Sequence, residues 1–238
     1  MEISKTQRRW AAGARLGAAL LLLTLAVSCT AKVDSRWLDR EIVIDGADAD
    51  WQGAKLNIED ANVDFGVFND QRYLYLVLSS MDRSIQTQMM RMGFTIWFDP
   101  EGRKKKVLGV RFPVGASERG GGMQPRNRGA GAGPDPKRFE EMVREILARG
   151  EMEIFTGGEE YGRRMPIAAA GELGLKARYS AGRLVYELRL PLLHGPKAPY
   201  ALGVYPGDQI GVGFETVEFD REQLRRQRGE FGGGFGGG

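Results

Sequence analysis

The sequence predicts an all-β protein: an antiparallel β-sandwich of jelly-roll-like character with one amphipathic helix and a glycine-rich loop insertion. Short apolar runs recur along the chain, and several alternate apolar with polar positions, as half-buried strands do. Turn residues separate these runs, as at Asn69-Asp70-Gln71 and Ser180-Ala181-Gly182, and such residues accept the backbone angles of tight hairpins. The 210 residues that follow an N-terminal leader (238 − 28) suffice for one domain with a substantial core.

The leader, residues 1–28, has the layout of an export signal. Four basic residues precede an apolar run over 16–27, which is too short to span a bilayer comfortably. The run ends at Ala26-Val27-Ser28-Cys29 and resembles the bacterial lipobox, in which the cysteine is acylated and becomes the mature N-terminus. The resemblance implies lipidation at Cys29 and a membrane anchor, and Thr30 in place of an aspartate implies sorting to the outer membrane. An ordinary signal peptide beside a lone cysteine is the alternative.

The charge of the mature chain argues against nucleic acid as a partner. Residues 1–28 hold four basic residues and one acid, which leaves 34 − 4 = 30 basic and 31 − 1 = 30 acidic residues. A net charge near zero does not supply the positive field that nucleic-acid binding requires. Because Cys29 is assigned to lipid and His194 is the only histidine, a zinc site built from cysteine and histidine is excluded too.

We expect a tether over 29–40, the sandwich over 41–220 and an Arg/Gly-rich tail over 221–238. An insertion over 113–134 and the tail are rich in glycine. Both lack the apolar surface that would offset the entropy of ordering, so we expect both to be flexible. Strands are predicted at 42–45, 63–68, 72–79, 93–98, 107–112, 152–156, 173–179, 183–190 and 209–214.

Two segments carry helical signals. Residues 137–149 follow a capping aspartate, Asp135, and Pro136, and Gly150 ends them. A shorter helix is expected over 82–92. The apolar residues of the longer helix form one stripe, which we expect to cover an open end or face of the sandwich: Phe139, Met142, Val143, Ile146 and Leu147.

Several short motifs support a resemblance to a known family. The opening Ile42-Val43-Ile44-Asp45-Gly46 leads to Asp50-Trp51, then to Asn69-Asp70 and Tyr73-Leu74-Tyr75-Leu76, and a late strand carries Glu187 and Pro191. This order is similar to the family 9 carbohydrate-binding module and its DOMON-like sandwich relatives, over most of residues 40–217. The resemblance implies a sandwich that binds glycan or another small ligand, and the family includes members that contain calcium.

Three aspartates near the opening motif suggest two interpretations. Asp45, Asp48 and Asp50 are spaced so that their carboxylates could converge on a hard cation such as calcium. Their glycine precedes most of the acids, however, unlike the glycine of an EF-hand loop. The interpretation that we favour is an Asx-type turn in which Asp45 and Gly46 reverse the chain. We therefore expect no cofactor, with calcium at these aspartates as the second interpretation.

Sugar recognition requires a flat aromatic surface flanked by polar groups, and the candidates are Trp51, Trp97, Tyr73 and Tyr75. Alternation places Tyr73 and Tyr75 on one face of their strand and Trp97 opposite its phenylalanine neighbours, so these three could share one outer face. The alternative is that the strands are covered on both faces and the aromatic residues belong to the core. Trp51 itself is expected to pack against the edge of the sandwich.

Enzymatic interpretations find little support in the sequence. It contains no Gly-x-Ser-x-Gly nucleophile motif, and the glycine-rich stretch at 115–120 lacks the lysine and hydroxyl of a phosphate loop. We therefore expect no enzyme, but a lipid-anchored protein of the cell envelope that binds glycan or another small ligand. The second hypothesis is an envelope scaffold or assembly lipoprotein whose partner is a protein.

Overall fold

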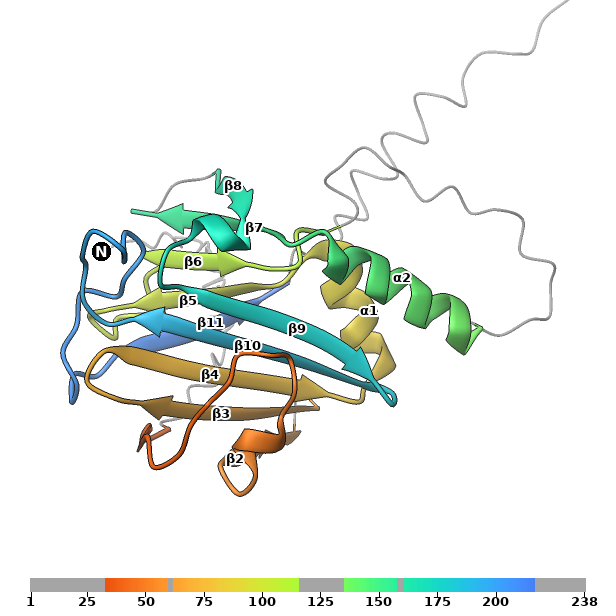
Figure 1. Ribbon diagram of the computed structural model, residues 1–238, viewed down its shortest axis with the longest axis horizontal. Helices are drawn as coiled ribbons and strands as arrows, with labels where there is room; N and C mark the ends of the chain where they lie inside the picture. Colours follow the sequence, from red (N-terminus) through yellow and green to blue (C-terminus); the bar gives the residue numbers. More distant parts are fainter. Residues whose placement is uncertain (1–32, 60–61, 116–134, 158–160, 217–238) are drawn as a thin grey trace, which may run out of the picture. The chain divides into compact units, whose positions relative to one another are not determined.

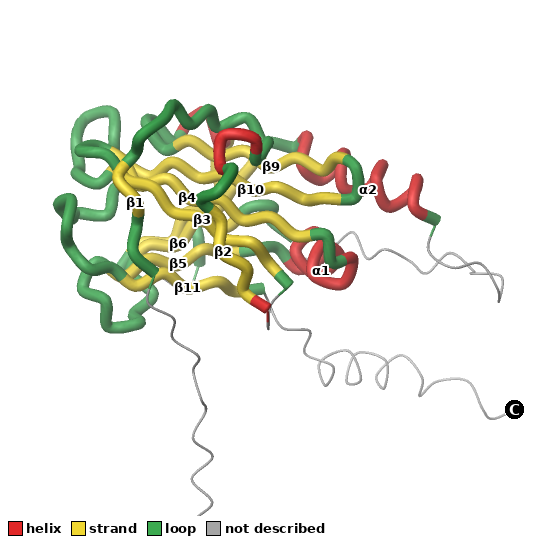
Figure 2. Tube along the Cα trace, turned by 90° about the horizontal axis from the view of Figure 1, so that it is seen from below, coloured by secondary structure: helices red, strands yellow, loops and turns green. Residues whose placement is uncertain are grey.

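A computed structural model describes residues 33–59, 62–115, 135–157 and 161–216. All elements discussed below lie within Asp34–Gly238, one of the two compact units of the chain. Two β-sheets pack face to face in this unit, and two helices accompany them (Figures 1 and 2). The predicted all-β sandwich is confirmed.

The first sheet, sheet A, has the strand order β1-β3-β4-β10-β9, and β2 also pairs with β3. Every pairing in it is antiparallel except that of β1 with β3. Because β1 and β2 pair with different halves of β3, they follow one another along its outer edge. The strands of sheet A are β1 (Arg36–Trp37), β2 (Lys55–Ile58), β3 (Val63–Asn69), β4 (Tyr73–Ser80), β9 (Gly174–Ser180) and β10 (Arg183–Pro191).

The second sheet, sheet B, is antiparallel throughout and has the order β11-β5-β6-β7-β8. The chain passes between the sheets after β4, β8 and β10. The strands of sheet B are β5 (Thr95–Asp99), β6 (Leu108–Arg111), β7 (Glu151–Thr156), β8 (Arg163–Pro166) and β11 (Gly211–Glu215).

Both predicted hairpin turns are present. In the turn from β3 to β4, Asp70 Oδ1 accepts backbone N–H groups of Arg72 at 2.6 Å and Tyr73 at 2.7 Å, so this side chain fixes the reversal. In the turn from β9 to β10, Ala181 and Gly182 have φ values of 49° and 80°. Positive φ at both central residues is what a two-residue hairpin that follows the twist of its strands requires.

Both predicted helices are also present, and the longer one has the predicted cap. Helix α1 spans Arg83–Met92, and Asp82 accepts its first free N–H groups. Helix α2 spans Pro136–Ala148 and is capped by Asp135. Its apolar stripe packs against the core through buried Val143 and Ile146, with the other stripe residues partly buried. The stripe thus covers one margin of the sandwich, beside β9 (Figure 1).

The main core fills the space between the two sheets. The leucine face of β4 points inward, as do Ile96 and Phe98 of β5. A second cluster lies on the outer face of sheet A, where the segment that follows β1 covers the strands. Its buried members are Ile42, Trp51, Ala54, Phe68, Tyr75, Val77 and Val185.

The N-terminal part of the fold differs from the prediction in two ways. Residues 42–45 are not a strand, because side chains take their backbone N–H groups: Asp50 Oδ2 accepts that of Val43 at 3.1 Å, and Glu187 accepts that of Asp45. The expected tether over 29–40 is also too long, since β1 pairs with β3 within it.

Two strands and the start of the insertion also differ from the prediction. Strands β2 and β8 were not predicted; each has four residues and lies at the edge of its sheet. At the start of the insertion expected over 113–134, residues 113–115 are buried, and Val114 belongs to the core. Residues 116–134 and the tail over 221–238 lie outside the described residues.

Candidate functional site

The opening motif is held by a buried glutamate of β10. Glu187 is completely buried, and its Oε2 accepts the backbone N–H groups of Asp45 at 2.9 Å and Gly46 at 2.6 Å. Its Oε1 accepts the indole N–H of Trp51 at 2.8 Å. One carboxylate therefore fastens the segment 42–53 onto the outer face of sheet A.

Trp51 fits this place because of a glycine beneath it. A Cβ atom at Gly66 of β3 would lie 3.1 Å from the Trp51 ring, closer than side chains normally pack. The ring also meets Phe68 at a centroid distance of 5.2 Å. Trp51 has no exposed surface, so it is a core residue and has no face for a ligand.

Burial raises the pKa of Glu187, and this effect outweighs the three N–H groups that favour its charged form. A buried carboxylate is tolerated where donors satisfy its oxygens, as they do here. The geometry therefore assigns Glu187 to holding the segment in place.

The three aspartates of the segment each have a local partner. Asp45 Oδ1 accepts the N–H of Ala47 at 2.7 Å, which is the geometry of an Asx turn. Asp48 pairs with Lys55, and this ion pair lowers the pKa of Asp48 against the opposing effect of burial. Asp50 accepts the N–H of Val43. Across the described ranges, no group of three or more His, Cys, Asp or Glu residues is arranged to hold a metal ion.

The remaining aromatic candidates do not share one face. Tyr73 and Tyr75 lie on sheet A with their ring centroids 6.0 Å apart, whereas Trp97 lies on sheet B. Tyr75 is buried and donates its hydroxyl to Asp70 Oδ2 at 3.0 Å. Burial, together with this bond, raises the pKa of Tyr75 to about 12. Tyr73, Tyr75 and Trp97 therefore do not form the common platform that alternation allowed, and Tyr75 fits the alternative of a strand covered on both faces.

Trp97 is partly exposed on the outer face of sheet B. Its ring lies over Gly109 of β6, where a Cβ atom would come within 2.5 Å of it. The Trp97 indole donates to Glu215 Oε2 at 2.6 Å, and the Lys106 ammonium lies 5.2 Å from the ring centroid. Phe155 flanks it at a centroid distance of 5.2 Å. A cation thus stands beside the ring that a sugar would have to approach.

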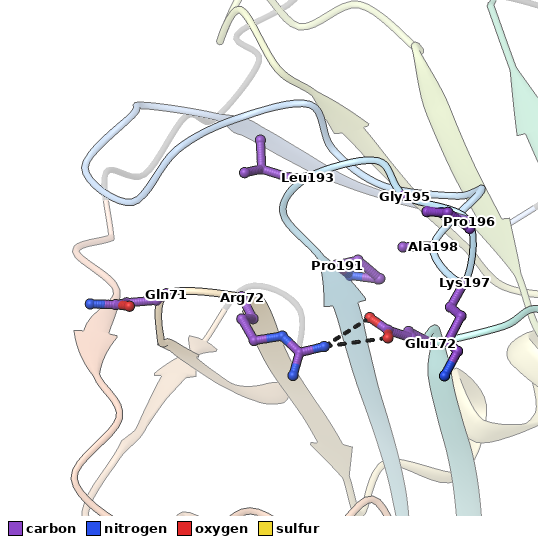
Figure 3. A pocket seen from close by; sticks show the side chains of 9 residues that line it. All are labelled: Gln71, Arg72, Glu172, Pro191, Leu193, Gly195, Pro196, Lys197 and Ala198. Atoms are coloured by element: carbon purple, nitrogen blue, oxygen red, sulfur yellow. Dashed lines mark hydrogen bonds and ion pairs between the residues drawn. The ribbon is translucent and has the colours of Figure 1, made fainter.

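Of the four candidates, Tyr73 bonds to Glu172, which lines a pocket with both polar and apolar walls. This pocket has a volume of about 390 Å³ and is formed by the β3–β4 turn, Glu172 shortly before β9, the end of β10 and the loop that follows it. Figure 3 shows Arg72 and Glu172 pointing toward one another on one side. The other lining residues are Gln71, Pro191, Leu193, Gly195, Pro196, Lys197 and Ala198.

Tyr73 and Arg72 hold the acidic group of this pocket. Tyr73 donates its hydroxyl to Glu172 Oε2 at 3.0 Å, and Arg72 approaches both oxygens of Glu172 at 3.3 Å. The guanidinium of Arg189 lies 4.9 Å from the Tyr73 ring centroid. Its buried Nε has no hydrogen-bond partner among the described residues. Burial and the bond to Glu172 raise the pKa of Tyr73, so its hydroxyl remains a donor.

Most of this pocket could not be predicted from the sequence. Arg72 and Glu172 are a hundred positions apart, and no local pattern joins them. The available signal was the glycine- and proline-containing stretch 191–199, which marks a loop directly after a strand. Pro191 was noted there as part of a motif, without a role at a site.

Cys29, the predicted lipidation site, lies outside the described residues. None of the helices in the described ranges is both long and apolar enough to cross a membrane. Comparison with known proteins adds no relative: no family model, no curated protein and no solved structure matches the chain.

Proposed function

We propose that the chain is a non-catalytic binding module of the cell envelope, anchored by lipid at Cys29, whose pocket beside Tyr73 takes a sugar-like ligand. The observation that carries the proposal is the composition of this pocket. Arg72 and Glu172 supply a donor and an acceptor, and Leu193, Pro191 and Pro196 supply apolar surface.

This division matches the chemistry of a pyranose ring. Such a ring has apolar faces formed by C–H groups and an edge of hydroxyls that both donate and accept hydrogen bonds. Ligand pockets in proteins combine apolar walls with a few fixed polar groups in the same way. A volume of about 390 Å³ holds roughly 13 water-sized groups, and a hexose has about 12 non-hydrogen atoms, so the pocket suits a single ring.

The polar groups are also preorganised. Glu172 is held from one side by the Tyr73 hydroxyl and from the other by Arg72. A ligand hydroxyl would therefore meet an acceptor whose position is already fixed, which lowers the entropic cost of binding. Arg72 is largely exposed, so it retains N–H groups that a ligand can reach.

Isothermal calorimetry against a panel of plant, bacterial and host glycans tests the binding site. We expect binding by the wild-type protein and an affinity about tenfold lower for Glu172→Gln and for Arg72→Ala, because each removes a polar contact. The matched control is Glu141→Gln, on the exposed side of α2, which should bind like the wild type. Folded protein that binds no glycan of the panel would contradict the proposal.

The anchor is tested separately. Cys29→Ser should abolish incorporation of radiolabelled palmitate and move the protein out of the membrane fraction, because acyl chains provide the attachment. Thr30→Ser leaves the cysteine in place and should keep both properties. Palmitate incorporation that persists in Cys29→Ser would show that the anchor lies elsewhere.

A protein partner is the second candidate function, and the outer edge of sheet A favours it. Trp37 of β1 and Leu56 of β2 are 55% and 49% exposed, and large aromatic residues are enriched where proteins meet. Cross-linking in intact cells would test it. Trp37→Glu should remove a specific cross-linked product that Glu141→Gln retains, and an unchanged product in Trp37→Glu would exclude this edge.

A further inference from the structure

A second cavity, of about 220 Å³, lies between the two sheets where β3 and β4 face β11. Helix α1 borders it at the end of the sandwich (Figures 1 and 2). Its lining is more strongly apolar than that of the pocket beside Tyr73, and it includes several aromatic rings. The lining includes Ile85, Met89, Phe94, Tyr186 and Phe214.

One polar side chain of this lining is unsatisfied. Tyr186 of β10 is 1% exposed, and its hydroxyl has no hydrogen-bond partner among the described residues. Buried hydroxyls are nearly always paired, because a hydroxyl that leaves water without a new partner loses hydrogen-bond energy. Burial also raises the pKa of Tyr186, so this hydroxyl is neutral and can donate. The unpaired group therefore indicates a missing partner.

Phe214 and a neighbouring hydrogen bond border the open side of the cavity. Phe214 is 40% exposed, stacks on Phe94 with an interplanar angle of 10°, and meets Phe65 edge to face. Gln88 of α1 donates a hydrogen bond to Thr216 Oγ1 at 2.6 Å beside it. A small molecule can therefore enter on this side while the backbone pairing of β11 with β5 is kept.

We propose that this cavity binds a compact, uncharged ring compound with one hydrogen-bonding oxygen, and that the Tyr186 hydroxyl is its polar contact. A volume of about 220 Å³ holds roughly seven water-sized groups, which corresponds to one six-membered ring with a substituent. The rings of Phe94 and Phe214 favour an aromatic ligand through edge-to-face and stacked contacts.

The ligand is uncharged because the lining offers no free counter-charge. Glu215 is the one charged residue among the lining residues. Its carboxylate is held on the outer face of sheet B by Trp97 and Lys106. This site is separate from the pocket beside Tyr73 and does not depend on the function proposed for that pocket.

Benzyl alcohol is the probe, and toluene, which lacks the hydroxyl, is the matched control. In NMR spectra of protein with methyl-labelled methionine, benzyl alcohol should shift the Met89 signal in a saturable way; Met89→Leu assigns that signal. Wild-type protein should bind benzyl alcohol about fivefold more tightly than toluene, as one net hydrogen bond provides. In Tyr186→Phe this preference should disappear while toluene still binds.

If Tyr186→Phe does not fold, a variant at the entrance of the cavity tests the proposed binding independently. Ile85→Trp should fill the entrance and abolish the shift of Met89, whereas Ser84→Trp, one residue away on the exposed side of α1, should leave it unchanged. A Met89 signal that does not shift with benzyl alcohol overturns the proposal. Equal affinity of the wild type for benzyl alcohol and toluene also overturns it, and so does binding that survives Ile85→Trp.

Discussion

Each outer face of the sandwich carries a tryptophan that lies over a glycine and donates its indole N–H to a glutamate. On sheet A the three residues are Trp51, Gly66 and Glu187, and on sheet B they are Trp97, Gly109 and Glu215. The indole-to-carboxylate distances are 2.8 Å and 2.6 Å. The two groups are therefore alike in residue types and local geometry.

They differ in what covers them. The segment 42–53 buries Trp51 and Glu187 completely, whereas Trp97 stays partly exposed beside Lys106. Burial raises the pKa of Glu187; at Glu215 the hydrogen bonds from Lys106 and Trp97 outweigh burial and lower the pKa. The same constellation fastens the fold on one face and forms a solvated surface cluster on the other. The role of each tryptophan–glutamate pair therefore depends on whether a chain segment covers it and whether a cation lies beside it.

Truncating the two tryptophans should give the largest difference between the faces. Trp51→Ala should lower the free energy of unfolding by about 4 kcal/mol, because it leaves a large cavity in a closed cluster. Trp97→Ala, the control on the other face, should cost about 1 kcal/mol, since water can fill the space. Urea denaturation measures both, and equal losses would contradict the assignment of Trp51 to the fold.

Removing the glutamates should give the next largest difference. Glu187→Ala leaves three buried N–H donors without an acceptor and should cost about 3 kcal/mol. Glu215→Ala removes an exposed ion pair and should change stability by no more than about 0.5 kcal/mol. The same denaturation experiment applies. A loss of less than about 1 kcal/mol in Glu187→Ala would show that water reaches the donors.

The aspartates of the segment 42–53 test whether a metal contributes to the covered face. Asp45→Ala should cost about 1 kcal/mol, the value of a local side-chain to backbone hydrogen bond, and equally so with calcium or with a chelator. If calcium bound there with an extracellular-type Kd, a tenfold excess would add about 1.4 kcal/mol. Calorimetric melting with both additions decides this, and a calcium-dependent Tm that is lost in Asp48→Ala would reverse our interpretation.

The smallest expected effect is an opposite dependence on pH. The raised pKa of Glu187 means that the native state holds the proton more tightly, so its contribution to stability is complete below the ordinary glutamate pKa and declines as pH rises through the raised value. The lowered pKa of Glu215 gives a contribution that is complete above the ordinary pKa and is lost as pH falls through the lowered value.

Denaturation midpoints between about pH 3 and pH 7 would detect this for Glu187→Gln and Glu215→Gln. The loss of stability caused by Glu187→Gln should be largest at the acid end, and that caused by Glu215→Gln should be largest at the neutral end. Two parallel curves would show that the two carboxylates titrate alike.

Local signals predicted most of the sandwich. The Asn69-Asp70-Gln71 turn, the cap Asp135 and the alternation in β4 each depend on neighbouring residues, and each is observed. The strand predicted at 42–45 was wrong because its N–H groups are taken by Asp50 and by a glutamate about 140 positions away.

The candidate sites depend even more on distant contacts. Its residue type and its place in an alternating strand identified Tyr73 as a candidate for ligand binding. Its hydrogen-bond partner Glu172, however, is 99 positions away in the sequence. Alternation could say which face of a strand Trp97 occupies, but not that its sheet differs from that of Tyr73. Sequence alone cannot assign strands to sheets when each hairpin fits equally well in either one.

The contact between Trp51 and Glu187 has a consequence for the order in which the chain folds. Trp51 precedes Glu187 by 136 residues, which a ribosome adds in roughly 7 to 27 s at about 5–20 residues per second. During that interval the apolar side of the segment 42–53 has no strand β10 on which to close. The segment that emerges early therefore docks late.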